Sequence, residues 1–171
     1  SNITVIDSKS FSAGYGLTLS EMAKKAYEGA DYKTVMSVYK QGMAKTEVYL
    51  IVNDLKHLQR GGRINPSAAL VGEVLGIKPI LTIRNGLIDS YSKVRGKRRA
   101  VEKLAELVID KTKGAKNLRV WFVHTDAEND AKLLRQIILE KVTPKEFMTM
   151  ELGPCIGSHT GAGLVGVIFS V

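Results

Sequence analysis

Residues 79–92, with the sequence PILTIRNGLIDSYS, place an Asn85-Gly86 dipeptide between two β-rich runs. Asn-Gly is the strongest short-range signal for a hairpin, because both central residues of a type I′ turn need positive φ. The stretch therefore predicts an antiparallel hairpin in which residues 79–83 pair with residues 87–92.

Further strands and helices are predicted on both sides of this hairpin. Runs rich in β-branched and aromatic residues predict strands over 3–6, 48–52, 118–123, 147–152 and 164–169. Apolar residues at helical spacing predict helices that begin near Lys97 and after the capping residues Thr18, Asp31 and Asp126. Two short helices are expected over 53–59 and from Asn65-Pro66 to Gly76.

This order of elements predicts an α/β protein whose larger part is an α+β unit with a hairpin. We place a domain boundary near Thr46, with residues 1–45 as the remnant of a first α/β domain and residues 46–171 as the second domain. One strand and two amphipathic helices cannot close a sheet. We therefore expect residues 1–45 to pack on an upstream part of a longer protein, or else on the second unit.

Composition limits the class of protein. The chain has 171 residues, of which 44% are hydrophobic and 25% charged, as in soluble globular proteins. The single cysteine, Cys155, excludes an internal disulfide and fits a reducing cytoplasm. No apolar run approaches the length of a bilayer-spanning helix. We therefore expect a cytoplasmic protein.

The net charge of +8 leaves nucleic acid, anionic membranes and acidic proteins open as partners. Basic residues cluster over 93–99 and again at Lys56, Arg60 and Arg63. Nucleic-acid-binding surfaces often interleave aromatic residues with such clusters, but here only Tyr91 is near. We therefore rank a nucleic-acid-binding module last.

Residues 153–163, with the sequence GPCIGSHTGAG, concentrate glycine between the last two predicted strands. Glycine permits positive φ and lets other atoms approach the backbone, so we predict a loop that brings N–H groups, a hydroxyl and His159 together. Such a loop suits an anionic head group, either carboxylate or phosphate. We favour a ligand role for His159 over a core role, because its neighbours Ser158 and Thr160 are small and polar.

Other candidate residues leave alternatives open. Cys155 and His159 would form a thiol–imidazole pair in an enzyme, although a lone cysteine beside an apolar residue is more often a packing residue. Arg63 follows Gly61-Gly62, where its guanidinium either reaches an anion or favours the end of a helix dipole. We interpret His57 as a surface residue and His124 as a strand-end residue that forms hydrogen bonds. The sequence contains no zinc-type Cys/His cluster and no Walker loop.

Four segments resemble the DegV family of bacterial proteins: IDSKS at 6–10 followed by Gly14 and Gly16, LKHLQRGGRI at 55–64, GIKPIL at 76–81 and GSHTG at 157–161. The match runs in order along essentially the whole chain. The resemblance implies a two-domain architecture with a mixed or antiparallel sheet and flanking helices. Similar proteins are usually longer before the point that matches Ile3, so we expect a C-terminal portion with the second domain whole and the first only in part.

The resemblance also implies a function. DegV-like proteins bind long-chain fatty acids, and some are the lipid-carrying subunit of a fatty acid kinase, presenting the acid to a separate ATP-using subunit that forms acyl phosphate. His159 and Thr160, with Ser158 and Gly161, match the head-group segment. Arg63 and Arg95 match basic residues that we assign to kinase docking or to the incoming phosphate.

We therefore expect a carrier without catalytic residues, metal or cofactor of its own, with bound fatty acid as its ligand. Its partners would be the fatty acid and the kinase subunit, not nucleic acid, and peripheral membrane contact stays open. The alternative is an enzyme that binds a phosphate-bearing ligand and uses Cys155 or His159.

Overall fold

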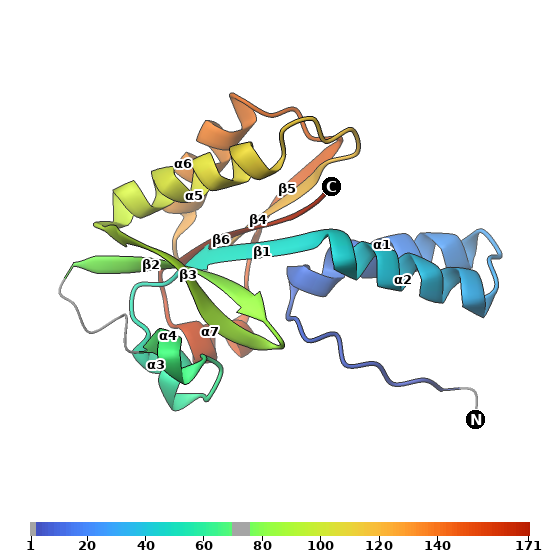
Figure 1. Cartoon of the computed structure of the whole chain (residues 1–171), viewed down its shortest axis with the longest axis horizontal. Helices are drawn as coiled ribbons and strands as arrows, with labels where there is room; N and C mark the ends of the chain where they lie inside the picture. The colour runs from blue at the N-terminus through green and yellow to red at the C-terminus, as the bar shows by residue number, and fades with distance from the viewer. Residues whose placement is uncertain (1–2, 70–75) are drawn as a thin grey trace.

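The computed structural model describes residues 3–69 and 76–171. Its strands form a six-stranded mixed sheet in the order β3-β2-β1-β6-β4-β5 (Figure 1). Neighbouring strands are antiparallel except β4 and β5, which are parallel. The strands are β1 (Thr46–Ile51), β2 (Ile77–Arg84), β3 (Leu87–Arg95), β4 (Arg119–Thr125), β5 (Glu146–Glu151) and β6 (Leu164–Ser170). The predicted α/β class with a mixed sheet is confirmed.

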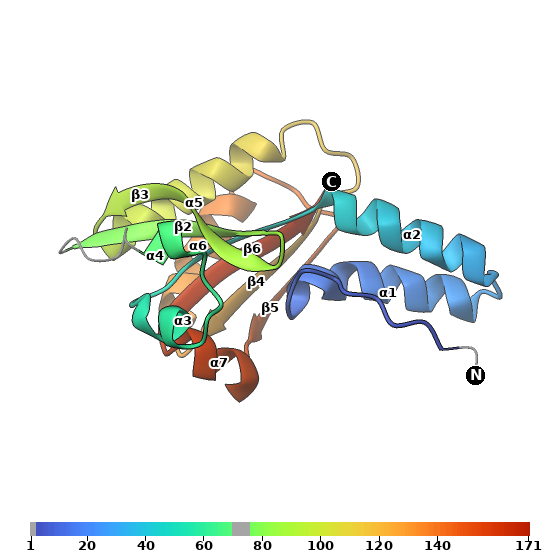
Figure 2. The ribbon, with the colours of Figure 1, turned by 60° about the horizontal axis from the view of Figure 1, so that its bottom comes forward.

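The helices flank the sheet on two sides. They are α1 (Ala13–Tyr27), α2 (Tyr32–Lys45), α3 (Lys56–Arg60), α4 (Pro66–Ala69), α5 (Lys97–Lys111), α6 (Glu128–Leu139) and α7 (Pro154–Thr160). Helices α5 and α6 cover one face, whereas α3 and α7 lie near the opposite face and the α1–α2 pair projects from the end of the sheet (Figures 1 and 2).

The β2–β3 hairpin has the predicted turn. Asn85 and Gly86 have φ values of 52° and 83°, as a type I′ turn requires. Arg84 pairs with Leu87 directly beside the turn, and Ile83 pairs with Ile88 next to them. The register shifts by one residue between Ile80 and Leu81, which is the signature of a β-bulge.

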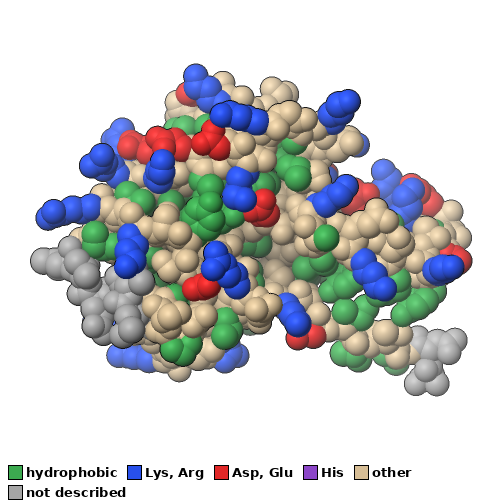
Figure 3. All heavy atoms as spheres, in the orientation of Figure 1, with side chains coloured by type: hydrophobic (Ala, Val, Ile, Leu, Met, Phe, Trp, Pro, Cys, Tyr) green, Lys and Arg blue, Asp and Glu red, His purple; other side chains and the backbone are tan. Residues whose placement is uncertain are grey.

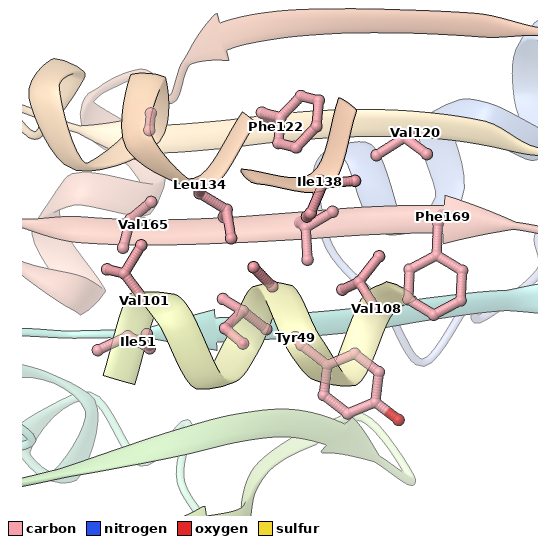
Figure 4. Packing of buried hydrophobic residues seen from close by; sticks show 14 of the residues in the cluster. Tyr49, Ile51, Val101, Val108, Val120, Phe122, Leu134, Ile138, Val165 and Phe169 are labelled. Atoms are coloured by element: carbon pink, nitrogen blue, oxygen red, sulfur yellow. The ribbon is translucent and has the colours of Figure 1, made fainter. Parts of the chain in front are cut away.

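Alternation along the strands produces two apolar layers. On β1, Tyr49 and Ile51 join the cluster beneath α5 and α6 (Figure 4), whereas Val48 and Leu50 join the cluster on the opposite face. Successive side chains of a strand point to opposite faces of the sheet, so a strand with apolar residues at every position is buried on both faces. The second layer, here called the α1/α7 face, contains Leu17 of α1 and Leu58 of α3.

One expected strand and two expected helix caps are wrong. Residues 3–6 are extended but have no strand partner among the described residues, and a β-rich run without a partner cannot become a strand. Helix α1 begins at Ala13, so Thr18 is a buried residue within the helix and not its cap. Asp126 has φ 47° and does not cap α6, which begins after Ala127. Asp31, in contrast, caps α2 by accepting a hydrogen bond of 2.8 Å from Thr34 N, as expected.

Arg119 joins the α1–α2 pair to the sheet. Its guanidinium, on β4, donates to Leu17 O at 3.2 Å and to Ser20 Oγ at 2.7 Å. It also forms ion pairs with Glu21 at 3.1 Å and Glu146 at 3.2 Å. None of the residues of α2, all of which are described, is buried. The proposed boundary near Thr46 stays a prediction.

Candidate functional site

The glycine-rich segment 153–163 contains a helix and not the expected loop. Pro154 occupies the first turn of α7 after the N-cap Gly153, a position where its missing N–H is not needed. Gly161 ends the helix with φ 71°, a left-handed value that favours glycine. Only Gly157 lies within the helix. The glycines thus mark the ends of a short helix, and the prediction of a loop was wrong for 154–160.

Helix α7 lies beside α3 (Figure 2), and histidine rings meet glycines at the contact between the two helices. A Cβ atom at Gly61, the C-cap of α3, would lie 2.7 Å from Nδ1 of His159. A Cβ atom at Gly161, the C-cap of α7, would lie 2.8 Å from Cδ2 and 3.1 Å from Nε2 of His57. Each ring therefore occupies the space that a side chain would need on the opposite helix end. The GGRI and GSHTG segments meet at this point.

The chain after α7 is fixed by the end of β4. Thr125 Oγ1 donates to Gly161 O at 2.7 Å and accepts from Leu164 N at 3.1 Å. Gly163 N donates to Thr125 O at 2.6 Å. Asn53 Nδ2, at the end of β1, donates to Ala162 O at 3.3 Å. These bonds hold the C-terminal end of α7 to the centre of the sheet, because β1 and β4 are the two neighbours of β6.

The predicted head-group residues have different surroundings. Thr160 is only 3% exposed, and its Oγ1 donates to Ile156 O at 3.0 Å within α7. Ser158 is exposed and donates to Cys155 O at 3.0 Å. His159 is half-buried against Gly61. Because both hydroxyls already donate within α7, they can accept further hydrogen bonds, and the imidazole of His159 is also available to a ligand. Either hydroxyl can rotate and donate to a ligand instead.

The two predicted basic residues lie apart. Arg63 is close to the start of β3, because its carbonyl accepts a hydrogen bond of 2.8 Å from Ile88 N. Its Nη1 donates to Gly61 O at 2.6 Å, so the guanidinium curls back onto the α3 terminus. Arg95 is the last residue of β3, a nine-residue strand. Arg95 follows Ile88 by seven residues, so at about 3.3 Å per residue Arg63 and Arg95 are near opposite ends of a span of about 23 Å. They do not form one site.

A narrow apolar crevice of about 10 Å³, the space of a single water molecule, lies on the α1/α7 face. Phe11 and Ala13, at the start of α1, form one side, and Val48, Leu50 and Val123 form the floor. The lining continues to Leu152 and Leu164, which flank segment 153–163. Through these two residues the chain connects the crevice to the α3–α7 contact, and the two together make up the candidate site.

His57 is exposed, so its interpretation as a surface residue is confirmed, but sequence reasoning missed the packing of its ring on Gly161. The one sequence signal for this packing was that His57 belongs to the same motif as Gly61, four residues before it. His124 behaves as expected of a strand-end residue: it is buried, and its Nδ1 accepts from Ala127 N at 3.5 Å.

Other features of the chain are less specific. Cys155 is exposed. Among residues 3–69 and 76–171, no three His, Cys, Asp or Glu side chains are grouped as a metal site would need. No helix within those same ranges is long and apolar enough to cross a membrane. Lys and Arg side chains are spread over the face drawn in Figure 3, with Asp and Glu beside several of them.

Similar sequences and similar solved structures both come from the same protein family. A DegV domain-containing protein of Clostridium perfringens is 35% identical over 170 residues, which are 98% of this chain and 59% of that protein. A fatty-acid-binding DegV family protein of Thermus thermophilus superposes with a TM-score of 0.90 at 30% identity, over 98% of this chain and 60% of the other. A fatty-acid-binding DegV family protein of Streptococcus agalactiae gives a TM-score of 0.88 at 28% identity, over 98% and 59% of the two chains.

The chain spans about three fifths of the length of these relatives. The DegV family model, described as "Uncharacterised protein, DegV family", matches residues 1–171, and the two motifs that meet at the α3–α7 contact belong to the segments that resemble this family. The fold and the full-length match agree, and this chain belongs to the DegV family.

Proposed function

We propose that this protein binds a long-chain fatty acid, with its carboxylate at His159 and Thr160 and its tail in the crevice on the α1/α7 face. The observation that carries the proposal is the apolar crevice, whose lining includes Leu152 and Leu164, the residues directly before and after segment 153–163 in the chain. Solved relatives with the same fold bind fatty acids, which supports the same ligand class. The crevice is narrow, so the proposal includes an outward shift of α1 when the tail enters.

Tail and head contribute differently to binding. Burial of the tail supplies about 0.8 kcal/mol per methylene, which accounts for most of the affinity. The head group fixes the orientation: His159 donates to the carboxylate from its imidazole, and the hydroxyl of Thr160 rotates from Ile156 O toward the ligand. Ser158, which is exposed, and Gly161, whose missing side chain leaves space for the His57 ring, complete the proposed head-group segment. Orientation of a carboxylate by a few fixed donors is the general pattern of such sites.

The chemistry on the bound acid is proposed to come from a separate fatty acid kinase subunit, which forms acyl phosphate from ATP. Arg63 is the better candidate for meeting the incoming phosphate, because it belongs to the same α3 terminus that contacts His159. Arg95, at the other end of β3, is the better candidate for docking the kinase. Their separation supports one role for each.

Residues 1–45 are proposed to belong to a first α/β domain. Ile3 and Val5 are 79% and 93% exposed, and Tyr27 is 96% exposed. About two fifths of the length of these relatives lies outside the matched part, which supports a further segment that covers these residues. We place the protein in the cytoplasm, where Cys155 stays reduced, and assign it no nucleic-acid partner.

The test is lipid extraction followed by binding. We expect mass spectrometry of the purified protein to detect a co-purified fatty acid, and a fluorescent fatty acid to be displaced by oleate. His159→Ala should weaken oleate binding by about tenfold or more, the loss expected for one hydrogen bond to a charged group. Arg98→Ala, an exposed residue distant in sequence from both motifs, is the control. Absence of both the extracted lipid and oleate binding in the wild-type protein would overturn the proposal.

A second experiment addresses the kinase. With a bacterial fatty acid kinase subunit and ATP, we expect acyl phosphate to form from the bound acid. Arg63→Ala should slow formation at saturating kinase, whereas Arg95→Ala should raise the kinase concentration needed for half-maximal rate. Equal effects of the two variants on both quantities would contradict the separate roles. The alternative is an enzyme built on Cys155 or His159, and among the described residues no hydrogen bond between the Cys155 thiol and the His159 ring supports it.

A further inference from the structure

His57 contacts the head-group segment from a different helix and a different motif. Its ring lies against Gly161, where a Cβ atom would be 2.8 Å from Cδ2, 3.1 Å from Nε2 and 3.5 Å from Cγ. Gly161 is the C-cap of α7 and follows His159 by two residues. The side chain of His57 is otherwise exposed. The ring is therefore placed to restrict the movement of the C-terminal end of α7.

His159 makes the reciprocal contact. Its ring lies against Gly61, the C-cap of the helix that carries His57. Each of the two short helices therefore presents a histidine ring to the glycine that ends the other helix. Because glycine has no side chain, each ring lies directly against the backbone of the other helix and cannot move closer to it. We refer to this arrangement as the crossed His–Gly contact.

Short helices depend on such contacts. Helix α3 has five residues and α7 has seven, and helices of this length are not stable by themselves in water. Their orientation must come from tertiary packing. Thr125 holds Gly161 from the sheet by its hydrogen bond to Gly161 O. The ring of His57, on α3, packs on Gly161 as well, so the end of α7 is held between Thr125 and His57.

We infer that His57 is a positioning residue that fixes the end of α7 and thereby the direction of the His159 imidazole. Its contact with Gly161 is one of shape, because it is made by the ring carbons Cδ2 and Cγ together with Nε2 against a residue without a side chain. A phenyl ring would fill the same space. The consequence for fatty-acid binding rests on the proposed function, whereas the effect on the His159 ring does not.

The first measurement reads the His159 ring directly. In protein labelled with ¹³C-histidine, the imidazole signals of His159 are compared between wild type, His57→Ala and His57→Phe without added lipid. We expect His57→Ala to shift or broaden these signals and His57→Phe to restore them. Lys56→Ala, the neighbouring exposed residue on α3, should leave them unchanged. Unchanged His159 signals in His57→Ala would overturn the inference, and so would a His57→Phe variant that behaves like His57→Ala.

The second measurement is oleate binding by the same variants. His57→Ala should weaken binding by about three- to tenfold, since an imidazole that must be ordered on binding loses the corresponding entropy. His57→Phe should remain within about twofold of wild type. The two failures are distinguishable: absence of oleate binding in wild type contradicts the proposed function alone, whereas normal binding by His57→Ala with unaltered His159 signals contradicts the positioning role alone.

Discussion

The position of a Cβ atom at Gly61 is 2.7 Å from Nδ1 of His159, closer than real Cβ contacts come. Gly61 has φ −78° and ψ −7°, which are ordinary helical values that any residue adopts. Glycine is therefore needed here for the space that the imidazole fills, and not for its backbone freedom. The adjacent Gly62 is the opposite case, with φ 62° and nothing within 4 Å of its Cβ position.

This contrast gives a matched pair of substitutions. Gly61→Ala should displace the His159 ring and weaken oleate binding by about tenfold. In a His159→Ala background the same change should have almost no further effect, because the two positions act through one contact. Gly62→Ala should instead lower stability by about 1 kcal/mol through its left-handed backbone, with oleate affinity retained. Isothermal titration and urea unfolding measure the two quantities, and a loss of affinity in both single variants would contradict the argument.

Arg119 should determine whether α1 stays on the sheet. Its side chain is 13% exposed and contacts Leu17 O, Ser20, Glu21 and Glu146. Arg119→Met keeps the apolar stem but removes these bonds, so we expect a loss of about 2 kcal/mol in the free energy of unfolding and faster hydrogen exchange in α1. Arg98→Met removes an exposed pair with Glu102 and should change stability by less than about 0.5 kcal/mol. Equal destabilisation by the two variants would refute the special role of Arg119.

Tyr49 should make the protein sensitive to alkali. Burial, followed by the hydrogen bond of 2.6 Å to Glu47, raises the pKa of Tyr49 from 10.0 to about 12. The pKa of Lys111 is also raised, first by its hydrogen bond to Glu47. Because the folded pKa of Tyr49 exceeds the unfolded one, its contribution to stability is complete below pH 10 and is lost as the pH rises toward 12. Urea unfolding across this range should show a steeper decline for wild type than for Tyr49→Phe, and parallel curves would disprove the assignment.

Thr160 separates a structural role from a ligand role. Thr160→Val keeps the shape and removes the hydroxyl that donates to Ile156 O. If Thr160 serves only α7, stability falls by about 1 kcal/mol and oleate affinity is unchanged. As a head-group ligand, its loss should weaken oleate binding by about tenfold or more. We expect the second result, with Ser158→Ala as a control whose effect is smaller because Ser158 is exposed.

Local signals predicted much of the fold. Asn85-Gly86 specified the hairpin by its turn chemistry, and Asp31 specified the start of α2 by its side-chain cap. Residues 3–6 have the composition of a strand, but a strand also needs a neighbour, and composition does not supply one. In segment 153–163 the density of glycine suggested a loop. The positions of Pro154 and Gly161, at the first turn and the C-cap, were the signals of a helix.

The candidate site was predictable only in part. The GSHTG and GGRI motifs could be identified separately, and the family resemblance linked both to one function. Their contact could not be predicted, because it depends on how α3 and α7 are placed by β1, β4 and β6. The same limit applies to His57, whose importance comes from Gly161, more than a hundred residues later in the chain.

The crossed His–Gly contact also has an evolutionary consequence. A methyl group at Gly61 fits only if the His159 ring becomes smaller or turns away, and at Gly161 the left-handed φ of 71° adds backbone strain to the same clash with His57. The four positions 57, 61, 159 and 161 therefore cannot vary independently. Homologues that replace one glycine should carry a compensating change at the facing aromatic position. Paired substitution across these sites would be the imprint of this contact in natural sequence variation.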